Sequence, residues 1–155
     1  MFYCSGGNVE RDGLLDTLNG FLMFKKKTND AEYTLEIATS LNLNDEYHKQ
    51  VHRIIISNSD TIIYKGSLPT TEIPKLLMES SILMMTPHEN YKSKGFPTKL
   101  GEYFASGTPV ICSAIDDLKE QITPDVVKFV EPNNVQDVCD AIIELVEDKE
   151  KATDK

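Results

Sequence analysis

Residues 94–109 read KGFPTKLGEYFASGTP, a pattern typical of a loop, a short helix and the entry to a strand. Gly95 allows a sharp turn, Pro97 suits the first helical position, where no N–H is needed, and Gly107 suits a helix end. A helix is therefore predicted from about Pro97 to about Gly107. Its first turn would present unpaired backbone N–H groups and the positive end of the helix dipole, which together suit a phosphate.

Lys99 and Glu102 are three positions apart and would share one face of this helix. Lys99 adds a positive charge for a phosphate, and Glu102 can accept hydrogen bonds from ribose hydroxyls, so the pair fits a nucleotide. The same spacing also fits an exposed helix with an ordinary ion pair. Spacing alone leaves both interpretations open.

Length and composition predict one globular domain with one core, because the chain has 155 residues of which 40% are hydrophobic. We expect this domain to cover residues 1–147, followed by a charged tail over 148–155 that frays. The net charge of −9 argues against general nucleic-acid binding but leaves room for one local phosphate site.

No apolar run approaches the roughly 20 residues that a membrane span needs, and no leader-like segment is seen. The chain is therefore expected to be cytoplasmic. Its three cysteines, Cys4, Cys112 and Cys139, show no Cys-x-x-Cys spacing, and we predict them to be buried free thiols in a reducing compartment.

Strand-like and helix-like segments alternate along the whole chain. This alternation predicts an α/β fold, a doubly wound, Rossmann-like six-stranded parallel sheet in a single domain. The expected strands cover 2–5, 33–39, 61–64, 82–85, 109–112 and 126–130. The expected helices cover 13–24 with a basic end at 25–27, 44–57, 70–78, 97–107, 116–122 and 134–146.

The usual strand order of such a sheet, 3-2-1-4-5-6, reverses between the first and fourth strands, and ligands sit outside their carboxyl ends. The loops at that place are Ser5 to Gly13, which contains Gly6-Gly7, and Thr86 to Pro97, which is longer than packing requires. The second loop leads into the helix with Lys99 and Glu102. Topology and motif therefore point to the same crevice and favour the phosphate interpretation.

Residues 95–103 followed by Ala105-Ser106-Gly107-Thr108-Pro109-Val110 resemble the signature of one enzyme domain. It is the C-terminal, donor-binding domain of GT-B-fold, family-four glycosyltransferases, the glycosyl transferases group 1. The similarity extends over about residues 2–147, through Asp12-Gly13 at the first helix, Lys65 to Leu68 after the third strand and Glu131-Pro132 before the last helix.

The resemblance implies roles for individual residues. Glu102 would bind the ribose of the donor, a nucleoside diphosphate sugar such as a UDP-sugar. The remaining implied substrate contacts are Gly95, Phe96, Pro97 and Thr98 at the donor sugar and diphosphate, Gly6 and Gly7 at the phosphates, and Gly66, Ser67 and Leu68 beside the base.

The chain departs from the family pattern at three positions. The family has a glutamate eight positions before the ribose-binding one, where this chain has Lys94, although Glu89 is near. The basic residues that typically hold the diphosphate are replaced by Gly7 and Asp12, and Arg11 and Lys99 are the possible substitutes.

Enzymes of this family transfer a sugar from such a donor, typically with retention and without a metal, so neither a metal nor another cofactor is expected. Positive groups must then stabilise the leaving diphosphate, which we assign to the helix amides with Lys99 and Arg11. His88, Glu89 and Lys94 are the candidates for catalysis, against the simpler view that His88 and Glu89 form a solvated loop pair. His48 and His52 have a metal-binding spacing but lack a third ligand.

The chain has the size of one half of a GT-B enzyme. The resemblance therefore implies an N-terminal partner domain, a glycan or lipid-linked acceptor, no nucleic acid, and a role in capsule or cell-envelope polysaccharide synthesis. Peripheral membrane association of the full-length enzyme stays open. A free-standing nucleotide-binding module and half of a nucleotide-sugar epimerase are the alternatives.

Overall fold

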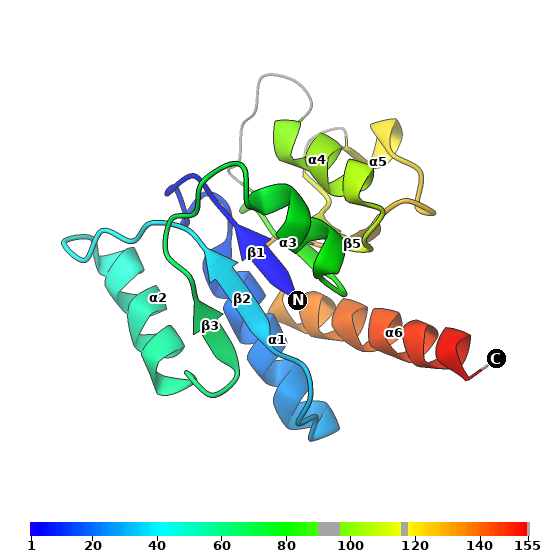
Figure 1. The fold of residues 1–155 in the computed structure, drawn as a ribbon, viewed down its shortest axis with the longest axis horizontal. Coiled ribbons are helices and arrows are strands. Elements are labelled where there is room, and N and C mark those ends of the chain that lie inside the picture. Colours follow the sequence, from blue (N-terminus) through cyan, green and yellow to red (C-terminus); the bar gives the residue numbers. More distant parts are fainter. Residues whose placement is uncertain (90–96, 116–117, 155) are drawn as a thin grey trace.

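A computed structural model describes residues 1–89, 97–115 and 118–154 of the chain (Figure 1). Six parallel strands form one sheet in the order β3-β2-β1-β4-β5-β6, which confirms the predicted order and its reversal between β1 and β4. The strands are β1 Phe2–Cys4, β2 Leu35–Ala38, β3 Ile62–Tyr64, β4 Leu83–Met85, β5 Val110–Ser113 and β6 Lys128–Val130. The helices are α1 Leu14–Thr28, α2 Glu46–Ser57, α3 Ile73–Glu79, α4 Thr98–Ser106, α5 Leu118–Gln121 and α6 Val135–Thr153.

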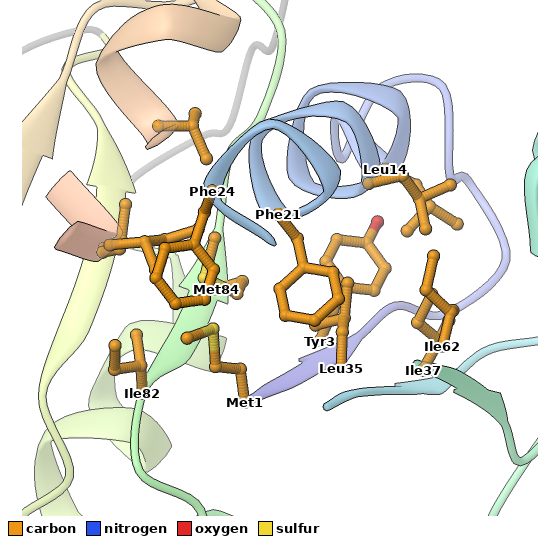
Figure 2. Packing of buried hydrophobic residues seen from close by; sticks show 14 of the residues in the cluster. Met1, Tyr3, Leu14, Phe21, Phe24, Leu35, Ile37, Ile62, Ile82 and Met84 are labelled. Atoms are coloured by element: carbon orange, nitrogen blue, oxygen red, sulfur yellow. The ribbon is translucent and has the colours of Figure 1, made fainter. Parts of the chain in front are cut away.

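Each face of the sheet has its own hydrophobic cluster, because neighbouring strand residues point to opposite faces. Tyr3 and Met84 belong to the cluster beneath α1, α2 and α6, whereas Phe2 and Leu83 belong to the cluster beneath α3, α4 and α5. Figure 2 shows the first cluster, with Phe21 and Phe24 of α1 packed over the sheet. Strand β4 is buried throughout, as expected for a central parallel strand.

Helix α4 matches its predicted extent closely. It ends at Gly107, whose φ of 73° is the left-handed conformation that glycine adopts without strain. Pro97 lies one position outside the helix and is extended, with ψ 118°, where the sequence predicts the first helical position. The chain therefore enters α4 directly from Pro97, without a side-chain cap.

Several predicted helix ends were wrong, and α3 begins at Ile73 where the sequence predicts a start at Thr70 or Thr71. Helix α6 continues to Thr153, so residues 147–153 are helical where the sequence predicts a helix end at Val146 and a frayed tail. The reason is that EDKEKAT has no glycine or proline stop and consists mainly of good helix formers. Helix α2 begins one residue later than predicted, because Asp45, in place of Asn44, caps it by accepting a hydrogen bond from the His48 amide.

The three cysteines are free thiols, with Cys112 and Cys139 buried and Cys4 half-buried, so Cys4 is less buried than predicted. In the part of the chain that the structure describes, no helix has the length and apolar character needed to cross a membrane.

Candidate functional site

The predicted crevice begins where the loops after β1 and β4 meet. The His88 amide donates a hydrogen bond to the Arg11 carbonyl oxygen at 2.9 Å. The Thr86 hydroxyl donates to the Gly13 carbonyl oxygen at 3.0 Å and lies 2.6 Å from the Thr17 hydroxyl, with both threonines buried. The two loops at the switch point are therefore held together by direct hydrogen bonds.

The start of α1 leaves little room for a ligand. Gly13 precedes the helix with φ 68°, and a Cβ on it would lie 1.6 Å from the Thr86 carbonyl oxygen. The Leu14 amide donates to the Val9 carbonyl oxygen at 3.0 Å, and the Leu15 amide donates to the Tyr47 hydroxyl at 3.2 Å. Because these amides are already paired, the start of α1 offers few free donors to a phosphate.

Lys99 reaches from the first turn of α4 to the end of β1. Its Nζ donates a hydrogen bond to the Cys4 carbonyl oxygen at 2.7 Å and lies 3.9 Å from Oδ2 of Asp12. Among the described residues, no ion pair joins Lys99 to Glu102, so the simple helix ion pair that the spacing allowed does not form. The charge of Lys99 is instead positioned at the predicted crevice.

Asp12 is the residue that connects the charges of the crevice. It is 7% exposed, and its Oδ2 accepts a hydrogen bond from the Ser5 hydroxyl at 2.6 Å. Its Oδ1 accepts from Nε of Arg11 at 3.0 Å, so one carboxylate lies between the two basic residues predicted to hold a diphosphate. In the sequence, Asp12 stands out as part of the Asp12-Gly13 match at the first helix and as a departure from the basic residue of the family pattern, and no local signal indicates this role.

Glu102 is exposed on α4, as expected for a ligand contact. Together with Thr70, which follows the segment Gly66 to Leu68, it lines a groove of about 300 Å³ between α3 and α4. The other lining residues are mostly apolar: Ile73, Pro74, Leu77, Met78, Ala105 and Ser106. Thr70 in the segment after β3 and the helix carrying Glu102 therefore meet at one groove.

The electrostatics at Cys4 show that these charges are close together. The pKa of the Cys4 thiol is raised, chiefly by burial, although its hydrogen bond with Tyr103 and the charge of Lys99 act to lower that pKa. Glu102 and Asp12 both act to raise the pKa of the same thiol. Lys99, Glu102 and Asp12 thus all lie within electrostatic reach of the end of β1.

Most of the other predicted binding residues that the structure describes lie in loops. Gly6 and Gly66 have free space where a Cβ would be, and Gly66 has φ 68°. Gly7 has φ 107° and packs near Ser40. Ser67 and Thr98 are exposed, Leu68 is half-buried, and Pro97 is buried. Lys94, Gly95 and Phe96 lie outside the described residues.

His88, one of the candidates for acid–base chemistry, lies beside the loop that leads into α1, where its amide donates a hydrogen bond to the Arg11 carbonyl oxygen. Burial raises the pKa of Asp16 in α1, while His88 and a hydrogen bond from the Asn133 backbone act to lower that pKa. His88 is therefore close to Asp16, and Glu89 is exposed. These positions assign no role in the reaction to His88 or to Glu89.

His48 has a structural role in the loop before α2. Its Nδ1 accepts a hydrogen bond from the Asn42 amide at 2.9 Å. In residues 1–89, 97–115 and 118–154, no group of three or more His, Cys, Asp or Glu side chains is placed to hold a metal ion.

The sequence from residue 13 to 154 matches the family model described as "Glycosyl transferases group 1". The chain belongs to this family. The match covers the α4 motif and the crevice residues from Gly13 onward, so the resemblance inferred from the sequence is confirmed. No sequence relative is found among curated proteins.

Solved structures of the same fold come from several bacteria. The C-terminal domain of LpcC, a glycosyl transferase group 1 family protein from Francisella tularensis, is 21% identical, with a TM-score of 0.78 over 96% of this chain and 76% of that one. Anabaena HepE in complex with UDP and glucose is 15% identical, with a TM-score of 0.77 over 97% of this chain and 39% of that one. Sucrose-phosphate synthase from Thermosynechococcus elongatus is 16% identical, with a TM-score of 0.75 over 95% of this chain and 36% of that one.

These likenesses establish the fold, a Rossmann-like α/β domain of the kind found in GT-B glycosyltransferases. The chain spans about two fifths of the length of the HepE chain, which is 39% covered, and most of the length of the LpcC domain, which is 76% covered.

Proposed function

We propose that this chain is the donor-binding domain of a glycosyltransferase that moves a sugar from a nucleoside diphosphate sugar to a glycan or lipid-linked acceptor. The observation that carries the proposal is the place of α4 beside the switch-point crevice, in a chain that matches the family model. Lys99 of this helix lies at the switch-point crevice, and Glu102, three positions further along, lines the groove between α3 and α4. A HepE structure in complex with UDP-glucose supports a uridine nucleotide as the first donor to test.

In this proposal the diphosphate binds at the start of α4, where the described residues provide no side-chain cap for the helix. Lys99 and Arg11 supply positive charge, and Glu102 accepts hydrogen bonds from the ribose. Stabilisation of the leaving diphosphate by these groups is compatible with metal-independent transfer with retention. An N-terminal domain would bind the acceptor. The complete enzyme would act in the cytoplasm, in the synthesis of capsule or cell-envelope polysaccharide.

Calorimetric titration with UDP, GDP and ADP, first without metal and then with magnesium, tests the proposal directly. We expect saturable, metal-independent binding of one of the three. Absence of binding at millimolar concentration, both for this chain and for a chain that includes the adjoining domain, would contradict it. An epimerase would instead convert the nucleotide sugar into its epimer without transferring the sugar, and NMR of the nucleotide-sugar products distinguishes it. Sugar transfer by this chain together with the adjoining domain distinguishes an enzyme from a binding module.

Glu102→Ala is expected to weaken binding of the preferred nucleotide by about tenfold, because charge-assisted hydrogen bonds to the ribose would be lost. The melting temperature should stay nearly unchanged, because the side chain is exposed. Glu147→Ala on the exposed side of α6 changes the net charge equally and serves as the control. Equal affinity of Glu102→Ala and the wild type would remove Glu102 from the site.

A further inference from the structure

The two basic side chains available for a diphosphate are already paired with a carboxylate of the chain itself. Asp12 contacts Nε of Arg11 at 3.0 Å through Oδ1, and its Oδ2 lies 3.9 Å from Nζ of Lys99. One negative charge therefore occupies the position between two positive charges that a bound phosphate would otherwise take.

This carboxylate is held firmly in place. The Asp12 side chain is 9% exposed, compared with 26% for Lys99 and 47% for Arg11. The Ser5 hydroxyl donates to its Oδ2 at 2.6 Å, and its own backbone amide donates to the Asn8 carbonyl oxygen at 3.0 Å. Because a buried carboxylate is strongly favoured to keep its partners, Asp12 acts as a fixed charge within the crevice.

We propose that Asp12 is an internal competitor for the donor's diphosphate, which lowers the crevice's affinity for phosphate by neutralising Lys99 and Arg11. The inference rests on the proposed function, in which the crevice takes a nucleoside diphosphate. In this proposal Asp12 determines how tightly the phosphate part of the ligand binds and does not affect the contacts with the base or the ribose. Weaker phosphate binding would apply equally to the donor and to the diphosphate product, and so favour product release.

A purely structural role is the competing explanation. Asp12 links the loop after β1 to α4, so its loss could simply loosen the crevice. The two explanations predict opposite changes in anion affinity. A loosened crevice binds an anion less tightly, whereas removal of a competing charge makes it bind more tightly.

The test is calorimetric titration of inorganic pyrophosphate, without metal, into the wild type, Asp12→Asn and Lys99→Ala/Asp12→Asn. Asp12→Asn is expected to bind pyrophosphate about tenfold more tightly, since one opposing unit charge a few ångströms away is removed. Part of the gain should disappear in the double variant, because Lys99 is one of the two charges that Asp12 neutralises. Asp140→Asn on α6, which breaks the 3.4 Å pair with Lys27, controls for the change in net charge and should equal the wild type.

Unchanged or weaker pyrophosphate binding by Asp12→Asn would overturn the inference, as would an equal gain in Asp140→Asn. Should Asp12→Asn melt below the titration temperature, Asp12→Ser must show the same gain. Parallel titrations with UDP, GDP and ADP separate this inference from the proposed function. If Asp12→Asn binds pyrophosphate more tightly but no variant binds a nucleotide, the inference is supported and the proposed function is contradicted. If all variants bind a nucleotide with equal affinity, the proposed function is supported and the inference is contradicted.

Discussion

Replacing Gly13 with alanine is expected to lower the free energy of unfolding by about 4 kcal/mol, through backbone strain together with overpacking. Gly13 has φ 68°, and its new Cβ would lie 1.6 Å from the carbonyl oxygen and 2.6 Å from the carbonyl carbon of Thr86. Both are backbone atoms at the end of β4, so no side-chain rotation can relieve the clash. A domain of this size has only about 5–15 kcal/mol of stability, so the variant should lose a large part of it and unfold at a markedly lower urea concentration.

Two other glycines separate strain from clash. Gly107 has φ 73°, and no neighbouring atom would lie within 4 Å of a Cβ on it. Gly107→Ala should therefore show only the conformational cost of the positive φ, about 1 kcal/mol. Gly6 has neither a positive φ nor a close neighbour, and Gly6→Ala should be nearly neutral. Urea unfolding followed by circular dichroism measures all three. If Gly13→Ala costs no more than Gly107→Ala, the contact with Thr86 does not constrain the switch point.

The fold was predictable because its signals are local. Alternating strand and helix patterns located all six strands, and Gly107 correctly marked the end of α4. The predicted strand order was confirmed, since it follows from the general rules for doubly wound sheets. The end of α6 was missed because a charged segment was taken as frayed, although its residues favour a helix.

The candidate site was predictable only in part. Sequence placed Lys99 and Glu102 on one helix near the crevice, which the geometry supports. It could not show that Lys99 pairs with Asp12, because that contact joins residues far apart in the sequence whose approach depends on packing of α4 against β1. The hydrogen bond between the Leu15 amide and the Tyr47 hydroxyl is another long-range contact that no local pattern indicates.

Helices α1 and α6 pack closely on the same face of the sheet, and Gly20 allows this approach. A Cβ on Gly20 would lie 2.3 Å from Cγ1 and 2.7 Å from Cβ of Val138. Val138 is 1% exposed, so it has no free space into which to move. Glycine inside a helix costs about 1 kcal/mol relative to alanine, and this close contact is the physical reason for its presence.

Gly20→Ala is therefore expected to destabilise the chain by about 2 kcal/mol, because overpacking outweighs the gain in helix propensity. Val138→Ala alone should cost about 2 kcal/mol through lost burial. The double variant should be more stable than the sum of the two single effects by about 1 kcal/mol, since Val138→Ala removes Cγ1, the closer of the two contacts, while the 2.7 Å contact with Cβ remains. Urea unfolding of the four proteins measures this coupling. Simple additivity would show that the two helices separate freely, and that Gly20 is not needed for their contact.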